Sequence, residues 1–147
     1  KNLFINIGAE AKISFPNKQP FFNTRGLGYG TDLVRGYELY VVDGQKYLWA
    51  RVNLRTKIWD KTLRIKWLKS SQFNRIPIQI YPNYFVDWGY VQNQYSYKNL
   101  SALANKPMYS TGFGMDAVTY YNLVVKLHWA INKEGKSGFI FNITREF

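Results

Sequence analysis

The stretch "YLWARVNLRTKIW" (residues 47–59) alternates between two kinds of side chain along its whole length. Successive side chains of a β-strand point to opposite faces of the sheet. One face would hold Leu48, Ala50, Val52, Leu54, Thr56 and Ile58, and the other Tyr47, Trp49, Arg51, Asn53, Arg55, Lys57 and Trp59. Three cations on one face are costly in a packed soluble core. They are natural on the wet inside of a wide barrel whose other face meets lipid.

A soluble sheet with one solvated face would show the same alternation, so strand length and aromatic flanks must decide. The segment "LFINIGAEAKISF" (3–15) alternates over thirteen residues, whereas soluble strands usually run to ~5–6 residues. The segment "GFIFNITREF" (138–147) has ten residues, the length of a tilted membrane-spanning strand of ~9–11 residues. Both lengths favour a membrane barrel.

The remaining alternating segments complete an all-β prediction of about six long antiparallel strands. They are "IPIQIYPNYFVDWGYV" (76–91), "MYSTGFGMDAV" (108–118) and "NLVVKLHWAIN" (122–132). Pro82 predicts a bulge within the first of them. The stretch "DKTLRIKWLKSSQFNR" (60–75) is basic and irregular, and we interpret it as a connection.

Composition limits the class of protein. The chain has 147 residues, enough for one domain, with 18% aromatic residues and no cysteine. Lys and Arg number 20 against 9 Asp and Glu, for a net charge of +11. Such an excess is compatible with a basic exposed face, nucleic acid, anionic lipid or a charged lumen. Because Lys1 is not an initiator Met, we expect a processed or excised piece of a longer chain.

Motifs for catalysis or metal binding are weak. The glycine-rich "RGLGYG" (25–30) lacks the spacing of a phosphate-binding loop, and His128 is the one histidine. We therefore predict no enzyme, no metal site and no cofactor. A basic surface with interleaved aromatics can bind single-stranded nucleic acid. Here the cations alternate strictly with apolar residues along whole strands, which favours a barrel wall.

A long loop at about 16–46 separates the first two predicted strands and contains "VRGY" (34–37). Loops of this length usually have a function. If the loop folds back into a barrel, Arg35 must find carboxylates or water. Glu10, Asp87 and Asp116 are the candidate partners. An exposed loop arginine with no fixed partner is equally compatible with the residues.

Four features together resemble the C-terminal part of the barrel of the BamA-type superfamily of outer-membrane assembly and secretion proteins, with a likeness to its Bacteroidetes members. "LVRGYE" (33–38) is similar to the V-R-G-F/Y motif of the loop that enters the barrel lumen. "YFVDWGYV" (84–91) is similar to the aromatic-x-D-x-G-x-V strand. "GFGMDAVTYYNLVVKLHWAIN" (112–132) resembles the G-x-G strand with its following hairpin, and the last ten residues resemble the closing strand. The likeness covers nearly the whole chain.

The resemblance implies that residues 1–147 are the last six strands of a sixteen-stranded outer-membrane barrel. Val34, Arg35, Gly36 and Tyr37 would form the lumen-loop motif, with Asp87 as the partner of Arg35. The family commonly offers a second carboxylate on the strand after the loop. That strand has none here, so Glu10 or Asp116 would substitute. The closing strand would meet the first strand of the barrel in a weak seam through Gly138, Phe139, Phe141, Ile143 and Phe147.

The function implied by the resemblance is the insertion of client β-barrel proteins into the cell outer membrane of a Gram-negative bacterium. The expected partners are the remaining barrel strands, POTRA domains, outer-membrane lipid, clients and accessory lipoproteins, with no nucleic acid. A secretion pore and a barrel anchor of the same superfamily are alternatives. From a different class, the alternative is a soluble cationic β-barrel that binds nucleic acid or a hydrophobic ligand. Aromatic residues expected at the membrane interface are Trp49, Trp59, Trp88 and Trp129.

Overall fold

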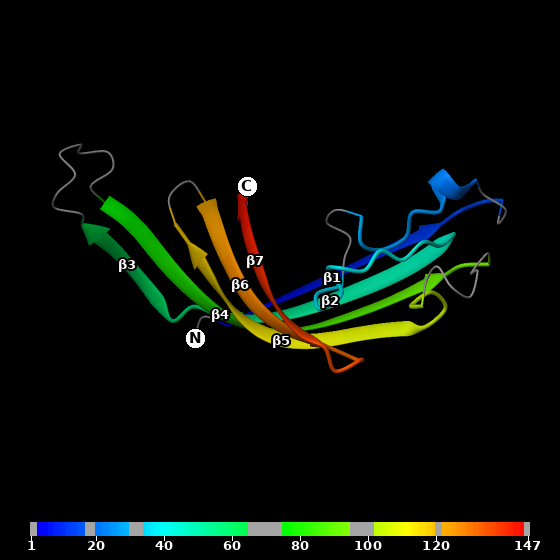
Figure 1. Ribbon diagram of the computed structural model, residues 1–147. Coiled ribbons are helices and arrows are strands. Elements are labelled where there is room, and N and C mark those ends of the chain that lie inside the picture. The colour runs from blue at the N-terminus through cyan, green and yellow to red at the C-terminus, as the bar shows by residue number, and fades with distance from the viewer. Residues whose placement is uncertain are drawn as a thin grey trace.

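The computed structural model describes residues 3–16, 20–29, 34–64, 75–94, 102–119 and 122–145. These residues form one antiparallel sheet of seven strands in the order β1-β2-β4-β5-β6-β7, with β3 also paired to β4 (Figure 1). The all-β prediction is confirmed, and the described sheet is open, with β1 and β7 at its edges. The strands are β1 (Leu3–Ile13), β2 (Lys46–Thr56), β3 (Trp59–Arg64), β4 (Arg75–Gln92), β5 (Pro107–Val118), β6 (Leu123–Asn132) and β7 (Ser137–Arg145).

The prediction of an irregular connection from residue 60 onward was wrong for β3. The lysine and arginine in this segment made it resemble a connection, but residues 59–64 form a strand that pairs with β4 from Trp59↔Ile80 to Arg64↔Arg75. Between Arg55↔Asn83 and Trp59↔Ile80, three residues of the β2–β3 chain face two of β4, which is a β-bulge. It lies opposite Pro82, which has no N–H to donate to the ladder. The predicted bulge therefore exists, but the extra residue belongs to the neighbouring strand.

The two faces of the sheet differ sharply in exposure. The apolar alternate positions, here called the outer face, are open: Ile7 is 76% exposed and Phe139 is 80% exposed. The polar alternate positions, here called the inner face, are buried or half-buried on the central strands β2, β4, β5 and β6, and Asp87 is 1% exposed. A water-soluble sheet shows the reverse arrangement. The exposed members of the outer face include Leu3, Ile5, Ile7, Leu48, Val52, Leu54, Tyr84, Val86, Phe113, Met115, Leu127, Phe139, Phe141 and Ile143.

Trp49 departs from the predicted aromatic girdle, and Trp59 departs from the face that alternation predicts. Trp49 pairs with Glu10 and packs its ring near Gly8, so it belongs to the inner face and not to an outer aromatic girdle. The bulge shifts Trp59 onto the face of Ile80, the outer face, instead of the polar face that simple alternation predicts. One inserted residue reverses the face of everything that follows it, because the side-chain period of a strand is two.

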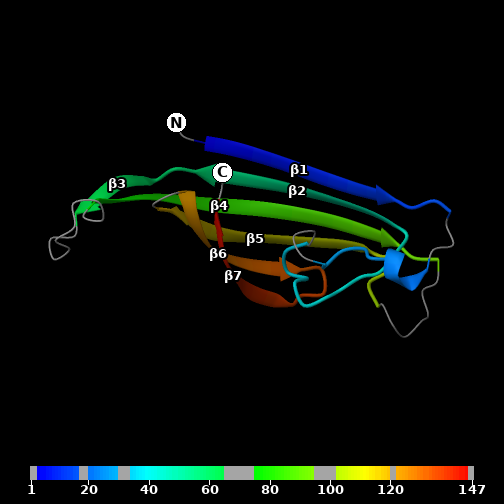
Figure 2. The same ribbon diagram turned by 90° about the horizontal axis from the view of Figure 1, so that it is seen from above.

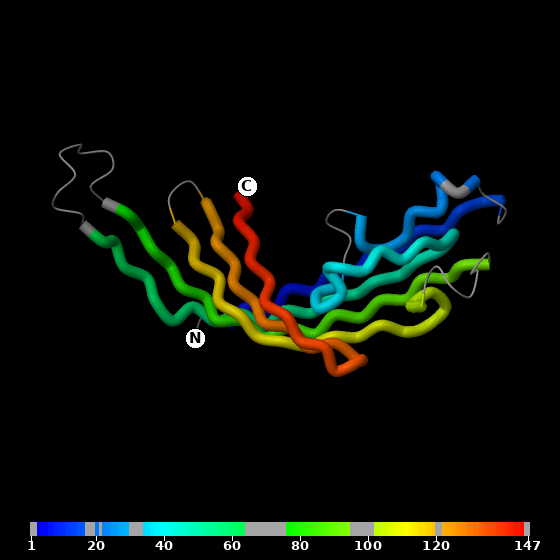
Figure 3. Tube along the Cα trace, viewed as in Figure 1, coloured from blue at the N-terminus to red at the C-terminus, as the bar shows by residue number. Residues whose placement is uncertain are grey.

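The described parts of the 14–45 loop, between β1 and β2, lie over the inner face of the bent sheet (Figures 1 and 2). The hydrophobic core is found there. Leu27, Val34, Tyr37 and Val42 of the loop pack against Tyr47, Val91, Ala104 and Met108. Two backbone hydrogen bonds between Leu27 and Val42, of 3.0 and 2.9 Å, join the two halves of the loop in an antiparallel bridge. Figure 3 shows the blue and cyan parts of this loop running along the concave side of the sheet.

Gly89 allows the loop to approach β4. A Cβ at this position would lie 2.6 Å from Cγ2 of Val34 and 3.1 Å from Cδ1 of Leu27. Real Cβ contacts are longer than this, so any side chain at residue 89 would push the loop away.

No helix among the described residues is long and apolar enough to cross a bilayer.

Candidate functional site: a buried arginine between loop and sheet

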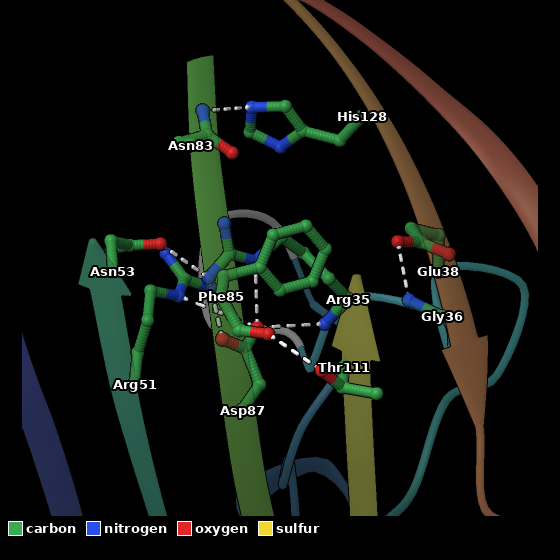
Figure 4. Close-up of polar contacts among 10 residues, drawn as sticks. All are labelled: Arg35, Gly36, Glu38, Arg51, Asn53, Asn83, Phe85, Asp87, Thr111 and His128. Atoms are coloured by element: carbon green, nitrogen blue, oxygen red, sulfur yellow. Dashed lines mark hydrogen bonds and ion pairs between the residues drawn. The ribbon is translucent and has the colours of Figure 1, made fainter. Parts of the chain in front are cut away.

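Arg35 of the loop binds Asp87 of β4 through three hydrogen bonds (Figure 4). Its Nε donates to Oδ2 over 2.8 Å and its Nη2 to Oδ1 over 2.5 Å. Its backbone N–H also donates to Oδ2, over 3.1 Å. Paired guanidinium–carboxylate bonds of this kind are among the stronger and more directional interactions in proteins. The predicted pairing of Arg35 with Asp87 is therefore present, and the exposed-arginine alternative is wrong.

The backbone after Arg35 turns sharply, which directs the arginine to the sheet. Gly36 has a φ of 86°, in the left-handed region that glycine enters without steric cost. Its N–H donates to Oε1 of Glu38 over 2.7 Å, and the N–H of Tyr37 donates to the carbonyl of Val34 over 3.0 Å. A Cβ on Gly36 would also meet Ser110, Ala130 and Asn132 at 3.4–3.5 Å. The order V-R-G-Y thus produces the turn that presents Arg35.

Neither Glu10 nor Asp116 binds Arg35, so the predicted second carboxylate is wrong. Asn53 of β2 occupies that place, and Arg35 Nη2 donates to its Oδ1 over 2.7 Å. Arg51, directly opposite Asp87 in the β2–β4 register, brings its Nε to 3.5 Å from Asp87 Oδ2. An amide oxygen accepts the hydrogen bond without adding negative charge, and two arginines share a single carboxylate.

Glu10 and Asp116 belong to other contacts on the inner face. Glu10 Oε1 accepts a hydrogen bond from the hydroxyl of Tyr47 over 2.6 Å. Asp116 is buried in a second cluster, with His128 Nε2 at 2.7 Å and Arg55 Nε at 3.3 Å from its oxygens. The amide of Asn83 lies 3.1 Å from the same His128 nitrogen. His128 is thus a residue of β6 with fixed partners on the inner face.

Phe85 contacts both the Arg35–Asp87 site and the Asp116–His128 cluster. The sequence interpretation missed this residue. Its ring is fully buried, and the guanidinium carbon of Arg35 lies 3.6 Å from the ring centroid. The centroid of the His128 ring lies 5.5 Å from that of Phe85. The sequence contained a clue, because strand alternation places Phe85 and Asp87 on the same face. Alternation does not reveal that the ring stacks with the guanidinium of the arginine.

We expect Phe85→Leu to lower the free energy of unfolding by about 1–2 kcal/mol, chiefly because the desolvated cation–π contact is lost. Urea unfolding of the protein folded in detergent micelles measures this. Phe113→Leu is the matched control, since Phe113 is an exposed phenylalanine on the outer face and should lose much less. Equal losses at the two positions would contradict a special role for the Phe85 ring.

The loop motif is also tied to the hairpin between β6 and β7. The hydroxyl of Tyr37 donates to Glu134 Oε2 over 2.6 Å, and Asn132 Nδ2 donates to the carbonyl of Gly36 over 2.9 Å. Burial, followed by the bond to Glu134, raises the pKa of Tyr37, so its hydroxyl stays protonated and able to donate. The motif therefore links the centre of the sheet to the hairpin that precedes the last strand.

The predicted closing-strand residues lie away from the arginine site. Gly138, Phe139, Phe141 and Ile143 belong to β7, which pairs with β6 alone. The last three point to the outer face and are exposed. Phe147 lies outside the described residues. Within the described ranges, no group of three or more His, Asp or Glu side chains could hold a metal ion.

Fold and site together define a class: an open, bent antiparallel sheet with an exposed apolar face and a polar face that holds an inserted, arginine-anchored loop. Comparison with known protein families, curated proteins and solved structures found no match to this chain. Its function must be inferred from the residues and their contacts.

Proposed function

We propose that this chain is the C-terminal segment of a BamA-like outer-membrane barrel that inserts client β-barrel proteins, using the edge of β7 as a template. One observation carries the proposal: Arg35 of "VRGY" lies on Asp87 of "YFVDWGYV", 52 residues away in the sequence. Both motifs belong to the resemblance described above, and their contact joins two independent parts of it.

The exposed outer face supports a membrane location. Exposed Leu, Ile, Val and Phe side chains continue from β1 to β7, far more apolar surface than single scattered residues would give. Every strand that spans a membrane must also satisfy its backbone groups within a sheet. An apolar outer face with a polar inner face is the arrangement that a barrel wall in lipid requires.

The same exposure disfavours the soluble cationic alternative. A nucleic-acid-binding sheet presents its cations and aromatic rings to solvent. Here Arg51 and Arg55 lie on the covered inner face and approach Asp87 and Asp116. These two arginines of β2 are therefore directed at carboxylates of the sheet.

The edge of β7 supports the templating role. In the described sheet β7 pairs with β6 alone, so its second edge is open to another strand. Unpaired backbone groups in lipid cost several kcal/mol each. A client strand that adds to this edge gains those hydrogen bonds, which is β-augmentation.

Site-specific crosslinking during client insertion tests the proposal. The chain has no cysteine, so Asn142→Cys on β7 would be the one thiol available to a client with a cysteine in its last strand. We expect a disulfide between the two while the client is being inserted. Lys126→Cys is the matched control, because Lys126 lies directly opposite Asn142 on β6, whose two edges are both paired.

Crosslinking at both positions, or at neither, would contradict templating at β7. A secretion pore would instead leave client insertion unchanged in an Arg35→Ala variant while export of its substrate fails. The assembly factor predicts the opposite result: fewer folded outer-membrane barrels in the Arg35→Ala strain.

A further inference from the structure

The glycines within the described strands all lie on the inner face of the sheet. They are Gly8 on β1, Gly89 on β4, Gly112 and Gly114 on β5, and Gly138 on β7. Glycine weakens a strand because it has no side chain to pack, and it often marks a place where another group approaches closely. We therefore looked for the neighbour that covers each of these positions.

Aromatic rings of an adjacent strand cover three of these glycines, and the loop covers Gly89. A Cβ on the glycine would lie 3.9 Å from the Trp49 ring at Gly8, 2.6 Å from the Phe85 ring at Gly112 and 2.8 Å from Cγ of the His128 ring at Gly114. Phe85 and His128 are directly opposite their glycines in the strand register. A ring that packs on a glycine of the neighbouring strand compensates for the missing side chain.

Gly138 is the exception. It is the second residue of β7, at the open edge of the described sheet (Figure 2). Nothing lies within 4 Å of a Cβ built at this position. Its direct partner on β6 is Ala130, which has only a methyl group, so β6 supplies no ring here. The space above Gly138 is therefore free for a side chain from the strand that adds to this edge.

We infer that Gly138 is a specificity-determining residue of the β7 edge, which selects client strands that carry an inward-facing aromatic residue at the position paired with Gly138. The inference rests on the proposed function, because it concerns the strand that adds to β7. The client ring packs on Gly138 as the Phe85 ring packs on Gly112. A flat ring lies against the bare glycine backbone more closely than a branched aliphatic side chain does.

The strand register fixes where this aromatic residue lies in the client. Every pair of neighbouring strands in the described sheet is antiparallel. A client cysteine that forms a disulfide with Asn142→Cys is paired with residue 142. In an antiparallel pair, the client residue opposite Gly138 then comes four positions after that cysteine. Four is an even number of residues, so both client side chains face inward.

Crosslinking of a client series tests the selection. Four versions of one client carry phenylalanine, tyrosine, leucine or alanine four positions after the cysteine. Each is offered to the intact protein with Asn142→Cys in lipid vesicles. We expect the two aromatic versions to crosslink about two- to fivefold more than the alanine version, the range that one cross-strand pair supports, with leucine clearly below them. Equal crosslinking of phenylalanine and leucine would overturn the inference, since apolar area alone would then decide.

A β7 variant with a matched control isolates the glycine. Gly138→Val fills the space with a branched side chain and should bring the crosslinking ratio of the phenylalanine and alanine versions to one. Thr144→Val alters the inner face of the same strand six residues away, and should leave the ratio unchanged. If Gly138→Val does not fold, Gly138→Ala, whose Cβ has open space around it, should lower the ratio. A preference that persists without Gly138, or that both valine variants lose, would contradict the inference.

The same series separates this inference from the proposed function. If no version crosslinks to Asn142→Cys, templating at β7 fails and the selection at Gly138 fails with it. If all four versions crosslink equally well, templating at β7 stands and the selection at Gly138 alone is overturned.

The first strand of the barrel itself is the competing occupant of this space. The chain has no cysteine, so Gly138→Cys provides a single thiol on the inner face. We expect a water-soluble maleimide to label this thiol before a client is added, and the phenylalanine client to slow the labelling. A thiol that is protected in the absence of a client would show that the first strand already covers residue 138, and would refute the inference.

Discussion

Asp87→Asn lowers the free energy of unfolding by roughly 3–5 kcal/mol, the largest expected effect of any single substitution in this protein. Asp87 is 1% exposed and is the carboxylate that accepts from Arg35 and lies 3.5 Å from Arg51. Its neutralisation leaves two cations in a covered site without a counter-charge. Urea unfolding in detergent micelles measures the change, and trypsin cleavage after Arg35, which is buried in the native protein, reports release of the loop.

Asp60→Asn is the matched control. Asp60 also has a cationic partner, Lys57, but this ion pair lies at the exposed surface, where such pairs contribute little. We expect no measurable change in stability. In the Asp87→Asn background, a further Arg35→Met substitution should cost much less than it does alone, because both changes remove one interaction. Additive losses would show that Arg35 and Asp87 act independently.

Gly112→Ala is expected to cost about 3 kcal/mol, the upper part of the usual range for overpacking. A Cβ at this position would lie 2.1 Å from the carbonyl oxygen of Trp129 on β6 and 2.6 Å from the Phe85 ring. The first contact is with backbone and cannot be relieved by a rotamer change. The β5–β6 ladder must therefore shift, and the ring must move from beside Arg35.

Gly138→Ala is the control for Gly112→Ala, because nothing lies within 4 Å of a Cβ at that position. We expect no loss of stability there, and a gain of up to about 1 kcal/mol from the reduced freedom of the unfolded chain. Thermal unfolding of both variants in the same detergent measures the difference. Similar losses at the two glycines would mean that flexibility, and not space, explains why β5 carries glycine.

The all-β class, the composition of the two faces and most strand positions could be predicted from the residues, since alternation is a local property. Leu48, Val52 and Leu54 share the outer face, and Arg51, Asn53 and Arg55 the inner face, as alternation requires. The pairing of Arg35 with Asp87 was predicted because both residues lie in motifs that resemble one family. Alternation and charge by themselves did not decide whether Arg35 is buried against a carboxylate or exposed.

Register and close approach needed the folded chain. Alternation assigns Asp87, Glu10 and Asp116 to one face, but not the neighbours of each, because one strand can slide along another in steps of two residues without changing faces. Asn53 therefore reaches Arg35 where a carboxylate was expected, and Tyr37 meets Glu134 across 97 residues of sequence. The bulge opposite Pro82 moved Trp59 to the other face, because one extra residue reverses the faces of all residues that follow it. Pro82 indicated a bulge, but only the paired strands show that the neighbouring chain carries the extra residue.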